Sequence, residues 1–428
     1  MDTQKKKIEL RPAEFTDIPE IMAFDAAIHA DKRVPMTIQD LLDVGKMSPE
    51  DFLLARDIKS GQVISSCCLI PQNIQYGDIP LKVGQPELVG TDPAYRRMGL
   101  VSQQFAELHR WSEARGDDLQ IIAGIPNFYR QYGYEMTINL DARRMGALSE
   151  LDALPQEPST LFFHSAVPED IPTLMRLFAE EGKRVLVAHQ WSELDWRYCI
   201  LDSQKGGCAA KHLVIIRREN GQVLGAVKTQ RFIDEGKYFI LGAEIDPVVT
   251  TWEEVIPPLL QFYKASALQA IQMDQKTIQK IGIQIPENHP LVNHLTHLFP
   301  EKYNGYAWYV RVPDLLVLLK KIKPVLEENI HNSAYQGLNR VVKINGYSSG
   351  FEIEFHHGKL IRIEPWQASS WEDGDFLCPE KVLYHLIFGH RSFQEIHDMF
   401  VDCYAKKDNG SLMDALFPKK ISFLCPVL

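Results

Sequence analysis

Two arginines and a glycine stand close together in residues 96–99, Arg-Arg-Met-Gly, where the pattern changes from strand to helix. Pro93 is expected to end the strand, and a helix is expected to begin near Leu100. The guanidinium groups bring positive charge, and glycine lets the backbone turn tightly and come close to a ligand. The first turn of the helix adds unpaired N–H groups and the positive end of its dipole. The segment therefore predicts a site for a ligand that carries phosphate.

A second set of reactive side chains lies in residues 127–134, Asn-Phe-Tyr-Arg-Gln-Tyr-Gly-Tyr. Residues 121–126 before it are typical of a buried strand, and Tyr129 is expected on a short helix that follows. A phenol has a pKa of about 10, so Tyr129 could donate a proton at neutral pH only across a short, preorganised contact. Tyr132 and Tyr134 compete for this role, although Tyr134 is expected to begin the next strand.

The element that must hold the basic turn is the helix after it. Val101, Phe105, Leu108 and Trp111 recur at helical spacing and would form one apolar face. A helix anchored by this face presents its first turn rigidly to a ligand.

Strand, basic turn, helix, strand and Asn-Phe-Tyr-(x)3-Gly-Tyr together resemble the GCN5-related N-acetyltransferases (GNAT). Their pyrophosphate loop has the form (Arg/Gln)-x-x-Gly-x-(Gly/Ala); Arg96 and Gly99 match it, and Val101 departs from it. The resemblance implies acetyl-CoA as cosubstrate and Tyr129 as general acid. Asn127 could equally be a helix cap. The residues implied to bind acetyl-CoA are Val89, Gly90, Thr91, Arg96, Arg97, Met98, Gly99, Leu100, Val101, Ser102, Gly124, Ile125 and Asn127.

The sequence also repeats itself. Asp-Ile-Pro at 17–19 returns at 170–172, Gly-Gln-Val at 61–63 returns at 221–223, and Ile-Pro at 125–126 returns at 285–286. This order predicts two acetyltransferase-type units in tandem. The second has no basic turn after Pro247, where Glu253 and Glu254 would meet a phosphate. We therefore expect a degenerate copy that serves as scaffold and as a wall of the acceptor cleft.

From Arg311 the pattern changes to a strongly apolar helix over 314–326, followed by alternating strands at 341–344, 351–355 and 359–364 and by further apolar helices. This part resembles the sterol-carrier-protein fold. Two acetyltransferase-like units before such a domain resemble the layout of the enhanced-intracellular-survival (Eis) acetyltransferases. The resemblance implies an α/β protein of mixed sheets, with two GNAT units at 1–150 and 151–310 and an α+β carrier-like domain at 311–428.

The Eis resemblance implies transfer of an acetyl group to a primary amine of a cationic acceptor, such as an aminoglycoside, a polyamine or a lysine. It also implies a homo-hexamer, and a terminal carboxylate that acts as base, here on Leu428 in place of the family's aromatic end. Because a terminal carboxylate has a pKa near 3.5, it is a poor base for an ammonium, and orienting the amine is the more reasonable role. A docked tail without chemistry is the alternative.

Composition excludes several other classes. The 428 residues carry a net charge of −10, which argues against nucleic-acid binding. No run of eighteen apolar residues and no hydrophobic signal core occur, so a cytoplasmic protein without membrane insertion is expected. The seven cysteines form no Cys-x-x-Cys pair, which favours reduced thiols and no metal.

Two other functions remain open from the sequence alone. The apolar helices of the third domain, with Leu315–Leu319, could line a tunnel in a non-catalytic protein that carries a lipid or acyl-CoA. A different acyl donor would also suit the same turn, because cleft width decides donor length.

Overall fold

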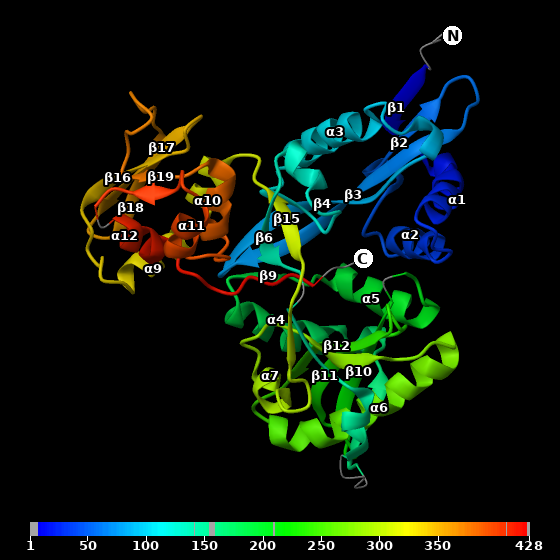
Figure 1. Ribbon diagram of the computed structural model, residues 1–428. Helices are drawn as coiled ribbons and strands as arrows, with labels where there is room; N and C mark the ends of the chain where they lie inside the picture. The colour runs from blue at the N-terminus through cyan, green and yellow to red at the C-terminus, as the bar shows by residue number, and fades with distance from the viewer. Residues whose placement is uncertain (1–6, 141, 154–158, 209, 408, 426–428) are drawn as a thin grey trace.

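The computed structural model describes residues 7–140, 142–153, 159–208, 210–407 and 409–425. It is a mixed α/β structure with three sheets of eight, seven and five strands, which occupy three regions of the molecule (Figure 1). In the part of the chain so described, no helix is both long and apolar enough to cross a membrane.

The first sheet has the strand order β1-β2-β3-β4-β5-β15-β6, and β9 pairs with β3. Within it β4 and β5 run parallel. Its strands are β1 (Ile8–Pro12), β2 (Phe52–Asp57), β3 (Val63–Tyr76), β4 (Ile79–Thr91), β5 (Leu119–Ile122), β6 (Glu135–Asn139), β9 (Val187–His189) and β15 (Ala307–Arg311).

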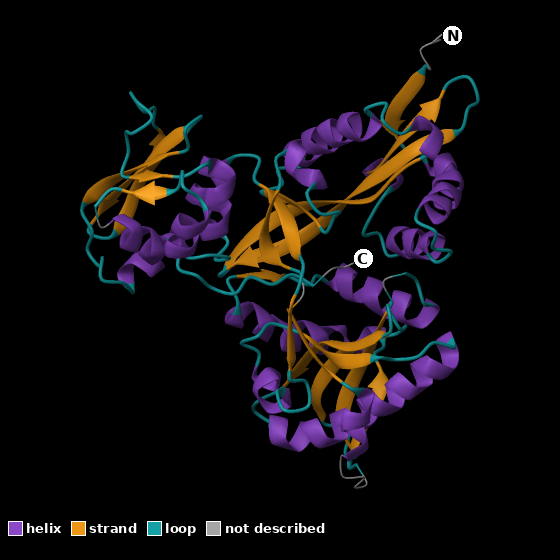
Figure 2. Ribbon diagram, in the orientation of Figure 1, coloured by secondary structure: helices purple, strands orange, loops and turns teal. Residues whose placement is uncertain are grey.

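Helices cover both faces of this sheet (Figure 2). α1 (Ile18–Ile28) and α2 (Val34–Asp43) pack on the face that carries Phe52 and Cys68. α3 (Leu100–Ala114) packs on the opposite face, where Leu108 meets Leu53 and Cys67. The alternation of neighbouring residues between the two faces follows from the two-residue period of a strand.

The second sheet has the order β14-β7-β13-β12-β11-β10-β8, with β12 and β13 parallel. Its strands are β7 (Ala142–Gly146), β8 (Leu161–Ser165), β10 (Lys211–Arg218), β11 (Val223–Gln230), β12 (Lys237–Ile245), β13 (Lys280–Gln284) and β14 (Glu301–Asn304). Its helices are α4 (Ile171–Arg184), α5 (Glu193–Lys205), α6 (Trp252–Asp274) and α7 (Pro290–Leu295).

The first two sheets exchange strands, which the sequence did not predict. β7 follows β6 in the chain but lies in the second sheet, between β13 and β14. β15 follows β14 but lies in the first sheet, between β5 and β6. Each sheet is thus completed by the segment that leaves the other. The predicted boundaries at 150 and 310 stay a prediction.

The third sheet has the order β18-β17-β16-β19-β20. The predicted helix over 314–326 is wrong in one respect, because two helices share this segment and meet at Ile322. Pro324 stands in the first turn of the second helix, where its missing N–H costs nothing, whereas it would break the interior of a longer helix. The strands are β16 (Arg340–Asn345), β17 (Gly350–His356), β18 (Lys359–Pro365), β19 (Phe376–Leu377) and β20 (Tyr404–Ala405). The helices are α8 (Leu315–Lys321), α9 (Lys323–His331), α10 (Glu380–Ile387), α11 (Phe393–Met399) and α12 (Asn409–Leu416).

Short 3-10 helices complete the fold. They are η1 (Phe15–Asp17), η2 (Pro49–Asp51), η3 (Pro93–Tyr95), η4 (Phe128–Tyr132), η5 (Leu148–Ala153) and η6 (Pro168–Asp170).

The C-terminal tail returns to the first sheet. Phe423 forms a parallel bridge with Asn139, and the Leu424 carbonyl accepts a hydrogen bond of 3.0 Å from Trp308 Nε1. Phe423 and Leu424 are buried, as the apolar composition of the tail predicts. Leu428, the predicted base, lies outside the described residues.

Candidate active site

The predicted basic turn joins β4 to α3. Two of its residues are left-handed, Arg97 with φ +65° and Gly99 with φ +76°, and Gly99 is the N-cap of α3. Glycine adopts this conformation without strain, whereas an arginine that adopts it is held there by its surroundings. Leu100 is buried beneath the turn, so the backbone bends around a fixed point.

Some side chains of the turn form hydrogen bonds that hold it in place, and others are exposed to solvent. Arg96 Nε donates to the Thr91 carbonyl at 3.3 Å and so holds the end of β4. Arg97 is exposed and has no hydrogen-bond or ion-pair partner among the described residues. Met98 is 40% exposed, and Ser102 Oγ lies 3.2 Å from the Tyr132 hydroxyl. Cations at a helix N-terminus oppose the helix dipole, and a bound anion removes that conflict.

A gap opens between β4 and β5 beside this turn. The two strands pair only at Val83↔Leu119 and Gly84↔Gln120, while β4 continues to Thr91. Leu88 has φ +51°, and the β3–β4 register shifts there. Within the described chain no second strand pairs with the end of β4 opposite β3. An extended amide-bearing ligand fits along such an edge as an added strand.

Tyr129 lies at the inner end of the gap, in a cluster of aromatic rings. Its ring centroid is 5.4 Å from that of Phe105 and 5.6 Å from that of Tyr309, and only 4% of the residue is exposed. Val89 and Val101 pack against the same cluster. The departure at Val101 therefore has a packing reason, because its side chain covers the aromatic cluster.

Gly124 makes room for the tyrosine. A β-carbon built there would lie 1.7 Å from Tyr129 Cε2, closer than any two non-bonded atoms approach. The Gly124 carbonyl accepts a hydrogen bond of 2.5 Å from the Tyr306 hydroxyl, and the exposed Ile125 accepts one of 3.2 Å from Tyr309. Asn127 has φ +65° and stands at the N-cap of η4, but its side chain makes no capping hydrogen bond.

The three candidate tyrosines have different surroundings. The Tyr134 hydroxyl lies 3.1 Å from His109 Nε2 and 3.3 Å from Gln120 Oε1, so it is engaged in the core. The Tyr132 hydroxyl meets Ser102. The Tyr129 hydroxyl has no hydrogen-bond partner in the described parts of the chain. Burial, followed by the nearby Glu87 carboxylate, raises the pKa of Tyr129, which keeps the phenol protonated.

Two carboxyl groups near the gap were missed from the sequence. Burial raises the pKa of Glu87 on β4 to about 7, against the weaker effect of hydrogen bonds from Gln85 and the Leu88 amide. Burial also raises the pKa of Asp25 on α1 to about 7. Ser66 Oγ donates a hydrogen bond to one of its oxygens, and the other has no hydrogen-bond partner among the described residues. A glutamate within an otherwise buried strand was the available signal for Glu87.

The turn between β12 and α6 in the second sheet, predicted from the sequence as the counterpart of the basic turn, is filled by its own side chains. Glu254 accepts hydrogen bonds from Thr250 Oγ1 at 2.8 Å and from Arg218. The backbone amide of Glu253, followed by the Thr251 side chain, lowers the pKa of the Glu253 carboxyl group. Carboxylates therefore already occupy the N-terminus of α6, where an anionic ligand would have to bind.

Residues 9–137 match the acetyltransferase (GNAT) domain family. Residues 9–137 form a GNAT acetyltransferase domain. The protein is accordingly an acyltransferase, and the basic turn, the gap and Tyr129 all lie within this domain. No curated protein matches the sequence.

Several solved structures share the fold of nearly the whole chain, including the GNAT domain and the parts that follow it. A probable N-acyltransferase of Enterococcus faecalis V583 is 12% identical, with TM-score 0.68 and coverage of 98% of this chain and 99% of that one. A GCN5-related N-acetyltransferase of Anabaena variabilis ATCC 29413 is 12% identical, with TM-score 0.66 and the same coverage. Eis1 of Mycobacterium abscessus is 12% identical, with TM-score 0.60, 97% of this chain and 99% of that one.

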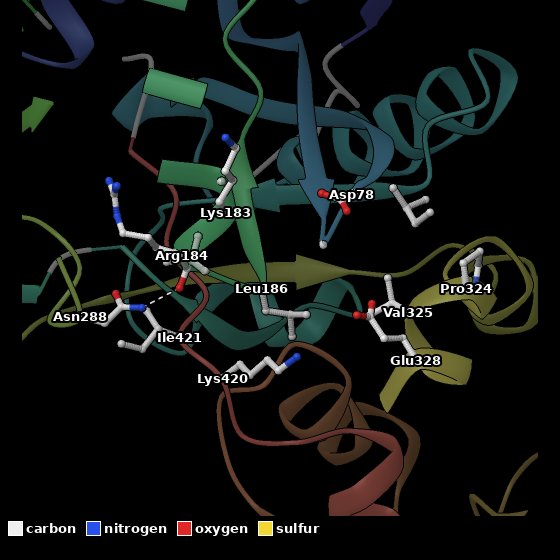
Figure 3. A pocket seen from close by; sticks show the side chains of 14 residues that line it. Asp78, Lys183, Arg184, Leu186, Asn288, Pro324, Val325, Glu328, Lys420 and Ile421 are labelled. Carbon is white, nitrogen blue, oxygen red and sulfur yellow. Dashed lines mark hydrogen bonds between the residues drawn. The ribbon is translucent and has the colours of Figure 1, made fainter. Parts of the chain in front are cut away.

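A large cavity lies away from the GNAT site. About 570 Å³ open between the β3–β4 hairpin tip, the end of α4, α9 and the C-terminal tail (Figure 3). Asn288 Nδ2 donates to the Arg184 carbonyl there at 2.6 Å. The cavity meets β4 at Ile79, the opposite end from Thr91, which is roughly 40 Å away along the strand. It therefore takes no part in chemistry at Tyr129. Among the described residues, no three His, Cys, Asp or Glu side chains are placed to hold a metal ion.

Proposed function

We propose that this protein transfers an acetyl group from acetyl-CoA to a primary amine on a cationic acceptor. The observation that carries the proposal is the gap between β4 and β5, which begins at Arg97 and ends at the hydroxyl of the buried Tyr129. Neither group has a hydrogen-bond or ion-pair partner among the described residues. A diphosphate fits the left-handed turn and the first amides of α3, and the thioester arm fits the free edge of β4. Val89, Gly90 and Thr91 supply that edge.

Replacing Arg97 by alanine is expected to raise the KM for acetyl-CoA about tenfold and to leave kcat nearly unchanged. A hydrogen bond to a charged group contributes about 1.5–3 kcal/mol, and 1.4 kcal/mol corresponds to a factor of ten. Steady-state kinetics at saturating acceptor measure this. Arg110→Ala is the matched control, because Arg110 lies on the exposed side of α3 and pairs with Glu107. Equal KM values for the two variants would remove Arg97 from the proposed site.

Acetyl transfer needs a proton donor for the leaving thiolate and a proton acceptor for the amine. Tyr129 is proposed as the donor, because burial keeps its phenol protonated and none of the described residues forms a hydrogen bond with its hydroxyl. Glu87 is proposed as the acceptor. An alkylammonium has a pKa of about 10.4, so proton transfer to Glu87 is uphill by about 5 kcal/mol, against about 9 kcal/mol for a terminal carboxylate of pKa near 3.5.

The pH profile should report Glu87. Its carboxylate form is the active one, so kcat/KM is expected to rise with pH through about 7, the pKa of Glu87 in the folded protein. Glu87→Gln should lower kcat by about tenfold to a hundredfold and remove this inflection, leaving only the rise at higher pH from the amine itself. An inflection near 7 that persists in the variant would assign it to another group.

The carboxylate of Leu428 remains a second candidate in this chemistry, with orientation of the ammonium as its role. The burial of Phe423 and Leu424 against β6 and β15 of the first sheet supports it. Adding one alanine after Leu428 is expected to depress turnover severalfold if the carboxylate touches the amine. Unchanged kinetics would leave the tail with a docking role alone.

Glu87, Asp25 and the net charge of −10 support a cationic acceptor. The decisive assay measures thiol release from acetyl-CoA with an aminoglycoside, spermidine and lysine peptides as separate acceptors. Release that depends on one of these amines supports the proposal. No release with any amine, while acetyl-CoA still binds, would contradict it.

The second sheet is proposed to be a degenerate copy of the first. The two sheets have the same strand order once the exchanged strands are included, with one parallel pair at the same place. Because carboxylates fill the turn before α6, the second sheet is proposed to support the acceptor cleft and not to bind acetyl-CoA. A homo-hexamer completes the proposal by resemblance to the Eis family. A cytoplasmic location without nucleic-acid or membrane partners is proposed from the net charge, the hydropathy and the cysteines of the sequence.

A cavity favours one alternative function. About 300 Å³ in the third region are lined by apolar side chains that include Leu315, Leu316, Phe351 and Leu383. A sterol-carrier-like domain that binds an apolar ligand there would make the protein a lipid or acyl-CoA carrier. Native mass spectrometry that detects a bound lipid, together with no amine-dependent thiol release, would favour the carrier.

A further inference from the structure

Two cysteines face each other across the last strands of the third sheet. β19 and β20 are antiparallel, with Phe376 opposite Ala405 and Leu377 opposite Tyr404. One further step in this register places Cys378 opposite Cys403. Their Sγ atoms are 3.3 Å apart, and both residues are completely buried. Both are free thiols in this structure.

The backbone places them at the closer kind of strand pair. Lys406 N donates to the Asp375 carbonyl at 2.9 Å, which makes 375/406 a hydrogen-bonded position. Hydrogen-bonded and non-hydrogen-bonded pairs alternate along an antiparallel ladder, so 378/403 is non-hydrogen-bonded. In agreement, Cys378 N donates to Asn345 and Cys403 N to Phe400. Such pairs have Cα atoms about 4.5 Å apart, within the span of a disulfide.

We propose that Cys378 and Cys403 form a disulfide when the protein meets a peroxide. One thiol attacks a peroxide oxygen and becomes a sulfenic acid as the O–O bond breaks and water leaves. The second thiol then attacks the sulfenic sulfur, forms the S–S bond and releases a second water. Two thiols and one hydrogen peroxide thus give one disulfide and two waters, with the peroxide reduced.

Access comes through the third region. Cys378 lines the cavity of about 300 Å³, together with Ser349 and Glu380. Burial raises the pKa of the Cys378 thiol, so little thiolate is present and the reaction is expected to be slow. Hydrogen peroxide is small enough to enter this cavity.

The adjacent cysteines Cys67 and Cys68 lack this geometry. Cys67 and Cys68 are adjacent on β3 and equally buried, but Cys67 packs with Leu53 on the α3 face and Cys68 with Phe52 on the opposite face. They provide an internal control, because both are as buried as Cys378 and Cys403 and lie next to each other in the sequence, but their side chains do not face each other.

The bond would close a loop that docks the third region on the GNAT domain. Residues 378–403 contain α10 and α11. The Ile387 carbonyl accepts a hydrogen bond of 2.6 Å from the Tyr76 hydroxyl, and Phe388 accepts one of 2.7 Å from Ser422 Oγ. Lys381 Nζ donates to the Arg130 carbonyl at 3.2 Å. Oxidation would therefore fix the segment that makes these contacts.

The test treats the full-length protein with hydrogen peroxide, then denatures it, alkylates free thiols and maps the peptides by mass spectrometry. We expect a mass loss of about 2 Da in one cross-linked peptide pair that contains Cys378 and Cys403, with Cys67 and Cys68 still alkylated, and a higher melting midpoint. Cys403→Ala should lose the cross-link and the increase. Alkylation of both cysteines after peroxide, or conversion to sulfinic acid without a cross-link, would overturn the proposal. If Cys403→Ala does not fold, the wild-type peptide map decides.

Discussion

Tyr129→Phe is expected to lower kcat by about 10²–10⁴-fold while the KM for acetyl-CoA stays nearly unchanged. The variant removes only the hydroxyl group, which has no hydrogen-bond partner among the described residues, so no protein group is left unpaired. The phenyl ring keeps its packing against Phe105, Tyr309 and the backbone of Gly124. A loss of rate at constant stability would therefore report a missing proton donor. Thiol release and the melting midpoint measure the two quantities.

Tyr132→Phe is the matched control. It lies on the same 3-10 helix and stacks on Phe105 with ring centroids 4.8 Å apart, but its hydroxyl faces Ser102. We expect its kcat to stay within about fivefold of the wild type, because a hydrogen bond of this kind contributes about 1 kcal/mol. Full activity in Tyr129→Phe would end the assignment of the general acid, and a large loss in Tyr132→Phe alone would transfer the role.

Asp195→Ala is expected to lower the free energy of unfolding by about 3–5 kcal/mol. Asp195 lies in the first turn of α5, beside the second sheet, and forms a buried ion pair with Lys46, which follows α2 on the first sheet. Without the carboxylate, the Lys46 ammonium keeps, among the described residues, only the Pro71 carbonyl at 3.1 Å and the Gln72 amide oxygen at 3.3 Å. An uncompensated charge in the interior is among the most destabilising changes in a protein. The midpoint of urea unfolding measures the effect.

Arg197→Ala controls for position on the same helix. Arg197 pairs with Glu193 one turn away, and the two side chains are 50% and 60% exposed. Such pairs contribute about 0.5 kcal/mol or less. The double variant Lys46→Met/Asp195→Leu should regain most of the lost stability, because apolar side chains replace a buried ion pair at little cost. Similar effects of Asp195→Ala and Arg197→Ala would show that burial of the Lys46–Asp195 pair has no energetic weight.

The helix after the basic turn could be predicted because its signals are local. Val101, Phe105 and Leu108 fall at helical spacing, and α3 begins at Leu100 as expected. Gly99 adopts the left-handed conformation that only its residue type enters freely. The short helix of Tyr129 was predicted for the same reason, since Pro126 and Gly133 limit it on both sides.

The roles of Glu87 and Asp25 could not be predicted from local patterns. A glutamate has an ordinary pKa in the sequence, and only the burial of Glu87 in the folded protein raises its pKa to about 7, against the opposite effect of hydrogen bonds from Gln85 and the Leu88 amide. The predicted continuous helix over 314–326 failed at Pro324 for a local reason that could have been applied.

The sequence by itself determined the turn of residues 96–99, the helix that follows it and the presence of Tyr129 at the next strand, because glycine, proline and apolar spacing act within a few residues. Tertiary structure alone decided what surrounds them. β15 comes from far along the chain, inserts beside β5 and brings Tyr309 against Tyr129. The tertiary structure also decided that only a residue without a side chain at Gly124 leaves room for the Tyr129 ring. It decided as well that Cys378 faces Cys403. Contacts between distant residues depend on which strands pair, and no local pattern in the sequence encodes an exchange of strands between two sheets.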